Sequence, residues 1–263
     1  MTQATRRGIG HAKKNEPMED AVLVTHCGPH ALLGIADGVG SKSSPHSREG
    51  AARALQVAAA HAIHQLPAYG PTEQLLWGVM AAVHVDITSY AKTRQHHPDA
   101  YASTLSLALL DGERIVAARI GDGSLYTWDG RKLTRFCSAN LPTNGTATIT
   151  HPNWRQWVTT ATHARDFTQG LVMCTDGADN LFLGPNRRGG RMAPSTDMID
   201  FIAQSHVESG SEGGLFAALN ILNDPAWLTQ TQDDRTFIIA MRPRPPSRRA
   251  DASSPEKATH ARL

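Results

Sequence analysis

Short apolar runs joined by tight turns dominate this chain, and they limit the folds that it can adopt. Three pairs of runs are each separated by two turn residues: 21–27 with 30–36, 101–110 with 113–120, and 124–128 with 131–136. Two of these turns are Asp111-Gly112 and Asp129-Gly130. Asp-Gly between apolar runs is typical of a β-hairpin, so we expect antiparallel sheets.

Helical patterns interrupt these strands in two places. Segments 47–66 and 72–95 are rich in alanine and leucine, with Ser47 and Thr72 as expected N-caps. Two shorter helices are expected at 197–209 and 213–222, and further strands at 171–175 and 236–241. Because strands and helices do not alternate one by one, we expect an α+β fold of antiparallel sheets with helices packed outside.

Length and charge indicate one domain with a tail. The 263 residues are 40% apolar, which suffices for a core at 1–242. The Pro-, Arg- and Ser-rich segment 243–263 has five basic and two acidic residues, so its charge is +3, while the net charge of the whole chain is +2. We expect this tail to be disordered. The remaining −1 on the body predicts no nucleic-acid-binding face.

The cysteines and the N-terminus indicate the compartment. Cys27, Cys137 and Cys174 are too few and too widely spaced for a disulfide framework or a zinc site. The N-terminal segment has no apolar core of a secretory signal, and no run approaches the roughly 18 apolar residues of a membrane span. A cytoplasmic protein that binds no membrane is expected.

Acidic residues stand at the ends of several predicted strands. They are Asp37 after 30–36, Asp122 after 113–120, Asp176 after 171–175, Asp233 and Asp234 before 236–241, and Glu19 with Asp20 before 21–27. Strand ends can meet at the rim of a sheet, where clustered carboxylates need cations and suit Mg²⁺ or Mn²⁺. Two such ions bind phosphate oxygens and lower the pKa of a bridging water molecule. The set therefore predicts a metal-dependent phosphoester hydrolase.

Each of these features also has a simpler explanation. A single Asp-Gly pair is more often a turn than a ligand. The histidines, including His11 near the first acidic pair, are expected at the surface or in packing roles. Trp154 and Trp157 are expected to pack over the sheet. It is the set of strand-end acids, rather than any one member, that favours a site.

Six motifs in order resemble the bacterial form of the protein phosphatase 2C family of metal-dependent serine/threonine phosphatases. They are NEPMEDA (15–21), GIADGVGS (34–41), STLSLALL (103–110), RIGDGSLY (119–126), MCTDGADN (173–180) and DDRTFIIA (233–240). The resemblance spans about residues 10–241. It implies a four-layer α-β-β-α sandwich of two antiparallel sheets. It also implies attack on the phosphoester by a metal-bound hydroxide, without a phospho-enzyme.

The resemblance also implies ligands for Mn²⁺ or Mg²⁺. Asp37 is expected to bridge two ions, and Gly38 to offer its carbonyl oxygen to one of them. Asp176 and Asp233 are expected to complete the ligands of the other ion.

Three further acids complete the implied set. Glu19 and Asp20 are expected to hold the second ion directly or through water. Asp122, with Asp176, matches the place where some bacterial members bind a third ion.

The chain departs from the family pattern at several positions. Where an Arg often holds the substrate phosphate, it has Asn15, and the neighbouring Lys14 is a candidate replacement as a point charge. Val39 replaces the histidine of eukaryotic members, which leaves the general acid unassigned. Family members usually have an acidic residue four positions after Asp176, and this chain has Asn180 there. The usual flap pattern is absent from the flap-like insertion at about 137–168.

These observations predict a phosphoserine/phosphothreonine phosphatase with a phosphorylated protein as its partner. A co-encoded kinase is a candidate substrate, and a monomer is expected. A catalytically weak module that binds phosphoproteins, and a phosphatase of small metabolites, are the alternatives.

Overall fold

Two five-stranded antiparallel sheets lie face to face in this computed structural model, which describes residues 1–143, 145–164, 166, 168–185, 192–228 and 230–242. The first sheet has the order β1 (Thr2–Arg6), β12 (Arg235–Met241), β9 (Gly170–Cys174), β6 (Ser124–Trp128) and β7 (Leu133–Arg135). The second has the order β2 (Ala21–Cys27), β3 (His30–Ala36), β4 (Leu105–Leu110), β5 (Arg114–Ile120) and β8 (Thr159–Ala164). A separate pair is formed by β10 (Leu183–Pro185) and β11 (Met192–Pro194).

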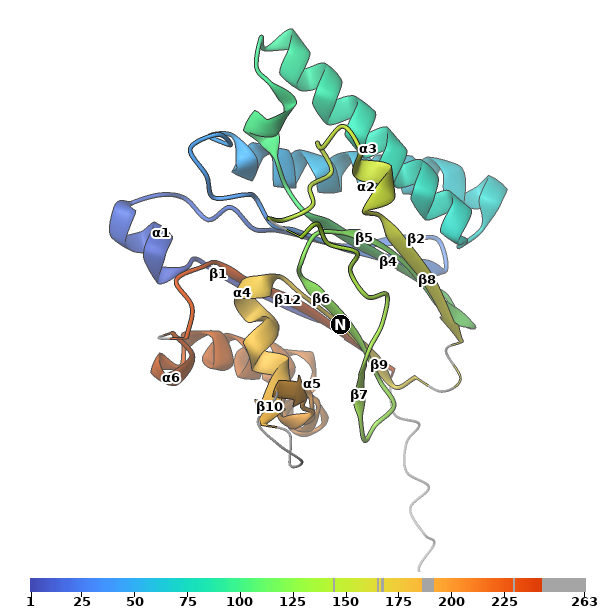
Figure 1. Ribbon diagram of the computed structural model, residues 1–263. Helices are drawn as coiled ribbons and strands as arrows, with labels where there is room; N and C mark the ends of the chain where they lie inside the picture. The colour runs from blue at the N-terminus through green and yellow to red at the C-terminus, as the bar shows by residue number, and fades with distance from the viewer. Residues whose placement is uncertain (144, 165, 167, 186–191, 229, 243–263) are drawn as a thin grey trace, which may run out of the picture.

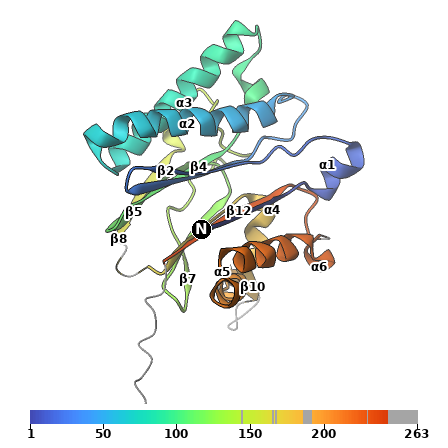
Figure 2. The same cartoon turned by 180° about the vertical axis from the view of Figure 1, so that it is seen from behind.

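Helices cover the outer face of each sheet (Figure 1). The second sheet carries α2 (Ser47–Tyr69) and α3 (Glu73–Thr93), and the first carries α5 (Asp197–Asn223). Shorter helices are α1 (Ile9–Lys14), α4 (Asp176–Asp179), α6 (Pro225–Leu228) and the 3₁₀ turns η1 (Pro98–Tyr101), η2 (Trp154–Gln156) and η4 (Asn180–Phe182). Figure 2 shows the same layers from behind. The four-layer α-β-β-α sandwich expected from the sequence is confirmed.

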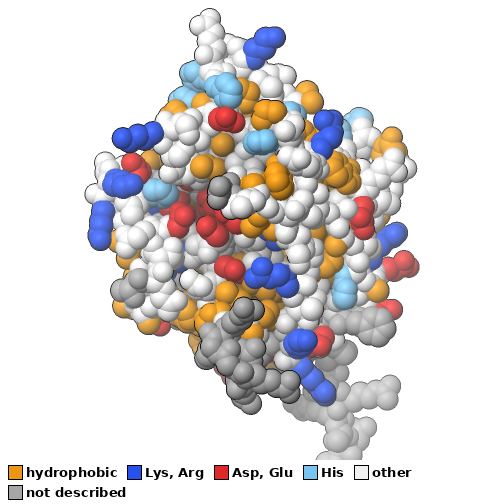
Figure 3. Space-filling model, in the orientation of Figure 1, with side chains coloured by type: hydrophobic (Ala, Val, Ile, Leu, Met, Phe, Trp, Pro, Cys, Tyr) orange, Lys and Arg blue, Asp and Glu red, His pale blue; other side chains and the backbone are white. Residues whose placement is uncertain are grey.

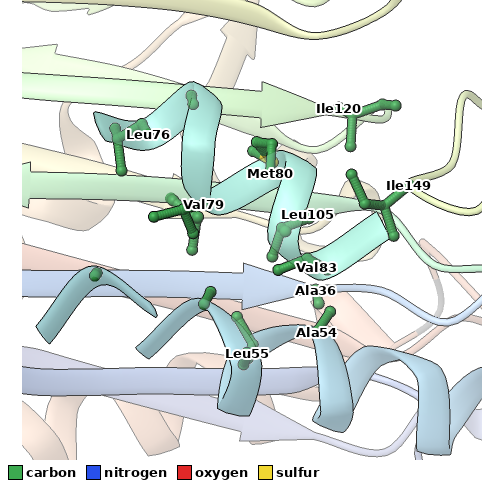
Figure 4. Close-up of a cluster of buried hydrophobic side chains, with 14 of the residues drawn as sticks. Ala36, Ala54, Leu55, Leu76, Val79, Met80, Val83, Leu105, Ile120 and Ile149 are labelled. Carbon is green, nitrogen blue, oxygen red and sulfur yellow. The ribbon is translucent and has the colours of Figure 1, made fainter. Parts of the chain in front are cut away.

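Three apolar layers hold the sandwich together. Between α2, α3 and the second sheet, side chains such as Leu76, Met80 and Leu105 are fully buried (Figure 4). Leu33 and Met173 meet between the two sheets. Phe237 and Ile199 pack between the first sheet and α5. Each layer removes apolar surface from water, which is the main stabilising contribution to a fold of this kind.

The predicted hairpins are present with the expected partners. Strand β4 pairs with β5 across Asp111-Gly112, and β6 pairs with β7 across Asp129-Gly130. Thr72 caps α3 by accepting a hydrogen bond from the backbone nitrogen of Leu75 at 3.2 Å. The expected N-cap Ser47 is instead the first residue of α2, because its hydroxyl is used elsewhere, as described below.

One strand differs from the sequence-based expectation. Strand β1 is not predicted by the sequence, because TQATR has no apolar run, yet Thr2 and Ala4 are buried where it pairs with β12. The two helices expected at 197–209 and 213–222 are present as the two parts of α5, which meet at a kink with non-helical backbone at Ser209 and Gly210.

The expected flap-like insertion is anchored to α3. Trp154 is fully buried, with the rings of Trp77 and His84 5.7 and 5.3 Å away, and it belongs to the core between α3 and the second sheet. Ring nitrogen Nδ1 of His84 lies 2.8 Å from the carbonyl oxygen of Ile149. Within the insertion, β8 pairs with β5 of the second sheet.

The proposed tail at 243–263 lies outside the described residues. Within the described part of the chain, no helix combines the length and the apolar character needed to cross a lipid bilayer.

Candidate metal centre

The strand-end acids gather at one rim of the sandwich. Asp37 follows β3, Asp122 lies between β5 and β6, and Asp176 begins α4 directly after β9. Carboxylate oxygens of these three residues all lie within 4.8 Å of one another. They come from both sheets, and Figure 3 shows acidic side chains gathered in a hollow left of centre on this face.

A second group lies beside the first. His11, Asp233 and Asp234 also have ligand atoms within 4.8 Å of one another. The negative charge of Asp233 contributes to raising the pKa of Asp37, of Asp176 and of Glu19. The two groups therefore form one continuous acidic centre, in which the charge of Asp233 affects residues of both groups.

The backbone at Asp37 is fixed by the strand that follows η1. The Asp37 backbone nitrogen donates to Thr104 Oγ1 at 3.0 Å, and the Thr104 backbone nitrogen donates to the Asp37 carbonyl oxygen at 2.8 Å. Gly38 pairs with Ser103 as an isolated antiparallel bridge. These contacts hold both residues after β3 has ended.

Asp122 stands where the chain crosses from the second sheet to the first. Gly121 makes the crossing at φ +112°, where a side chain would also collide with Thr104. Arg119 of β5 donates to the carbonyl oxygens of Gly121, at 2.8 Å, and Gly123. Thr146 of the insertion donates to Asp122 Oδ2 at 2.6 Å. Both the backbone of this loop and the Asp122 side chain are therefore held by hydrogen bonds.

The first acidic pair is held by hydroxyl groups from distant elements. Ser47 donates to Glu19 Oε1 at 2.8 Å, and Thr175 donates to Asp20 Oδ2 at 3.0 Å. The other oxygens, Glu19 Oε2 and Asp20 Oδ1, are buried and have no hydrogen-bond partner among the described residues. Unpartnered buried carboxylate oxygens are costly, and here each is free to bind a ligand.

Crowding and burial raise the pKa values of this centre. Burial raises the pKa of Asp20 to about 7, with a contribution from the charge of Asp234. Burial and the charges of Asp122 and Asp233 raise the pKa of Asp176 to about 6. The pKa of Asp37 is well above its usual range because of burial and the charges of Asp20, Asp176 and Asp233.

The donor set fits hard divalent cations. Carboxylates with such raised pKa values share protons when no cation neutralises them. Oxygen donors are the ligands that Mg²⁺ and Mn²⁺ prefer. The converging aspartates and the two unpartnered oxygens are therefore a suitable environment for Mn²⁺ or Mg²⁺.

Two charged residues that the sequence places close to the motifs, Lys14 and Asp179, have other partners. Lys14 Nζ lies 3.6 Å from Glu16 Oε2, and its suggested contact with phosphate stays a prediction. Asp179 accepts from the Tyr126 hydroxyl at 2.6 Å and lies 3.7 Å from Arg135 NH2, so it supports α4.

Three residues contribute more than the sequence-based expectation gives them. His11, expected in a packing role, has its ring between Glu19 and Asp234. Asp234, expected only as one of the strand-end acids, accepts from the backbone nitrogens of Gly8 and Glu19, both at 2.6 Å, so it anchors the N-terminal segment. The sequence signals for these two residues are the adjacency of Asp234 to Asp233 and the position of His11 near the first acidic pair. No sequence pattern singles out Arg119.

A double-sheet sandwich with aspartates converging on one rim defines a metal-dependent protein phosphatase. The chain belongs to the protein phosphatase 2C family, since the model of that family, "Protein phosphatase 2C", matches residues 7–220. Enzymes of this family depend on Mn²⁺ or Mg²⁺. No curated protein matches the chain.

Solved structures share the fold at low sequence identity. The serine/threonine phosphatase Stp1 from Staphylococcus aureus is 17% identical, with a TM-score of 0.59, covering 92% of this chain and 94% of its own. The catalytic domain of the serine/threonine protein phosphatase PstP, in complex with two manganese ions, is 20% identical, with a TM-score of 0.57 and coverages of 91% and 96%. A bacterial serine phosphatase bearing an R161A mutation is 17% identical, with a TM-score of 0.60 and coverages of 91% and 96%.

Proposed function

We propose that this chain hydrolyses phosphoserine and phosphothreonine in a protein substrate, using divalent ions at the rim. The observation that carries the proposal is the convergence of Asp37, Asp122 and Asp176, whose oxygens lie within 4.8 Å of one another. When bound, the ions neutralise the charge of the phosphate group and activate a water molecule that lies between them for attack on phosphorus.

In this proposal each acid has a defined task. Asp37 would be a ligand of both ions, and the Gly38 carbonyl oxygen would be a further ligand of one of them. Asp176 and Asp233 would hold the other ion together with Asp37. The hydrogen bonds between Asp37 and Thr104, and the bridge pairing of Gly38 with Ser103, support this assignment, since preorganised ligands need no rearrangement when the ions bind.

The remaining acids serve the second and third ions. Glu19 and Asp20 bind the second ion through their unpartnered oxygens or through water. Asp122 joins Asp176 at a third ion. Lys14, on α1 at the edge of the centre, is proposed to attract the phosphate group as a point charge.

Hydrolysis of an aryl phosphate and of phosphopeptides in millimolar Mn²⁺ tests the proposal. Wild-type protein is expected to be active, and Asp37→Ala or Asp176→Ala to abolish activity. Asp86→Ala is a suitable control, since Asp86 pairs with Arg53 on the outer helices. An inactive wild-type protein in Mn²⁺ would contradict the proposal. Preference for sugar phosphates over phosphopeptides would favour the small-metabolite alternative.

A module that binds phosphoproteins without turnover is the second candidate. It is favoured by Asn15, which stands where family members often have a phosphate-binding Arg. It is also favoured by Lys14, whose Nζ is paired with Glu16. Calorimetry with a phosphopeptide distinguishes the two functions, because tight binding with no release of phosphate supports the module.

The domain limits and the partner are part of the same proposal. The catalytic unit is residues 1–242, and its substrate is a phosphoprotein such as a co-encoded kinase. A chain ending at residue 242 is expected to keep the activity of the full chain, measured on the same phosphopeptides. Loss of activity on removing 243–263 would place the tail within the functional unit.

A further inference from the structure

His11 occupies a position that its expected packing role does not explain. It lies on α1, and its side chain is 13% exposed. Ring nitrogen Nδ1 is 3.0 Å from Asp234 Oδ1, and ring nitrogen Nε2 is 3.6 Å from Glu19 Oε2. The ring therefore connects the residue that anchors the N-terminal segment with an acid of the metal centre.

Asp234 lies beside one nitrogen of the ring and is itself held in place. Its side chain is 1% exposed, and the backbone nitrogens of Gly8 and Glu19 occupy one carboxylate oxygen each. Nδ1 lies within ion-pair distance of this carboxylate but is not aligned for a hydrogen bond among the described residues, and Nε2 lies on the side of Glu19. A carboxylate behind one ring nitrogen, with the other nitrogen directed at a cation, is the usual arrangement of metal-ligating histidines.

Gly40 lies beside both His11 Nε2 and Glu19 Oε2. A Cβ atom placed on Gly40 would lie 3.1 Å from Glu19 Oε2 and 3.8 Å from His11 Nε2. Glu19 Oε2 is buried and has no hydrogen-bond partner among the described residues. Close by in sequence, Asp20 is 6% exposed and its Oδ1 is likewise unpartnered in the described part of the chain. Donor atoms thus border a space that no side chain of residue 40 fills.

We propose that His11 Nε2 is a ligand of the cation that Glu19 binds. Two donors that are each about 2.1 Å from one ion lie about 3.0–3.4 Å apart. The 3.6 Å between His11 Nε2 and Glu19 Oε2 therefore requires a shift of only a few tenths of an ångström. This inference rests on the proposed function, because it assigns a nitrogen ligand to the metal centre described there.

The nitrogen ligand has a consequence for the choice of metal. Imidazole binds transition-metal ions in preference to Mg²⁺, whose ligands are oxygens. His11 therefore biases this position toward Mn²⁺. Replacing His11 by Gln is expected to weaken Mn²⁺ binding more than about 10-fold, since losing a direct ligand should cost at least as much as losing a supporting group, and to change Mg²⁺ binding much less.

The test uses electron spin echo modulation of Mn²⁺ bound to the full-length wild-type protein. Unlabelled protein is expected to show ¹⁴N modulation from a coordinated imidazole, and protein labelled with ¹⁵N-histidine to show the ¹⁵N pattern instead. His11→Gln should lose the modulation. His64→Gln, an exposed position on α2, is the matched control and should keep it.

The outcomes separate the inference from the proposed function. Bound Mn²⁺ without nitrogen modulation in the wild-type protein would overturn the role of His11 and leave the phosphatase proposal standing. Failure of the wild-type protein to bind Mn²⁺ would contradict the metal centre itself. Absence of nitrogen modulation in the wild-type protein overturns the inference whether or not His11→Gln folds. A positive signal is assigned to His11 by its loss in His11→Gln or, if that variant does not fold, in His11→Ala.

Discussion

At the scale of single residues, charge is concentrated at the rim beyond what the fold needs. Asp37 is surrounded by Asp20, Asp176 and Asp233, and burial together with these charges raises its pKa. Arg119 shows the opposite case. It is a 1% exposed cation whose side-chain hydrogen bonds go to backbone carbonyl oxygens beside Asp122. Taking the charge of each residue out of water lowers the stability of the fold. Both charges nevertheless help to shape the acidic centre.

Replacing Asp37 separates function from stability. Asp37→Asn is expected to lower activity more than about 100-fold, since loss of a direct ligand should exceed the loss of a supporting group. In the presence of a chelator, the same change should raise the melting temperature, because it removes a buried carboxylate from three like charges. Phosphopeptide hydrolysis and thermal unfolding measure the two effects. A lower melting temperature in chelator would contradict the view that Asp37 is kept for function.

Arg119 is predicted to be needed as an arginine. Arg119→Lys should destabilise the protein by about 1–3 kcal/mol, because an ammonium group cannot reach the carbonyl oxygens of Gly121, Gly123 and Cys137 together. Urea denaturation measures the change. Arg114→Lys, at an exposed position of the same strand, is the matched control and should change stability little. Equal effects of the two substitutions would exclude a special role for the Arg119 contacts.

At the scale of elements, the insertion between β7 and β8 couples the helical layer to the metal centre. Ala147, Ile149 and Trp154 belong to the core under α2 and α3, while Thr146 donates to Asp122. The Ile149 backbone nitrogen also donates to the Ser103 carbonyl oxygen at 3.0 Å, beside Gly38. The packing of this segment on α3 therefore positions two residues of the rim.

Truncation of Trp154 tests this coupling. Trp154→Ala should lower the free energy of unfolding by about 3–5 kcal/mol, as expected for removal of a fully buried indole. It should also weaken metal binding at Asp122, since Thr146 would lose its support. Denaturant unfolding and Mn²⁺ calorimetry measure these effects. Trp157→Ala, at a half-buried position of the same segment, should have a smaller effect on both; an equal effect would argue against anchoring through Trp154.

At the scale of the whole molecule, stability is linked to pH through the acidic rim. The pKa of Asp20 is about 7 and that of Asp176 about 6, both above the ordinary value of 3.8. The folded state therefore binds more protons than the unfolded state between pH 4 and 7. Stability from these groups is fully present below about pH 4 and is lost as the pH rises through 6 and 7.

In chelator, the free energy of unfolding should fall between pH 5.5 and pH 8. The raised pKa of His11 acts in the same direction, since burial would lower it but the contact with Asp234 and the nearby acids raise it overall. Saturating Mn²⁺ should remove this fall, because the cations replace the protons. Urea denaturation at the two pH values, with and without Mn²⁺, measures the effect. A stability that rises with pH in chelator would contradict the raised pKa values.

The sequence alone determined the local features of this protein. The hairpins at Asp111-Gly112 and Asp129-Gly130, the paired helices and the order of the motifs all depend on neighbouring residues, so they were predictable. The positions of Asp37, Asp122, Asp176 and Asp233 at strand ends were equally visible. Turn propensity and apolar periodicity act over a few residues, and a single sequence records them directly.

Only the tertiary structure decided which of these residues meet. The contact of His11 with Asp234 spans more than 200 residues of the chain, and β1 pairs with β12 between the two segments that carry these residues. The burial of Arg119 and the anchoring of Trp154 on α3 likewise follow from how the layers pack. Side chains far apart in sequence are brought together by long-range packing, which no local pattern in one sequence specifies.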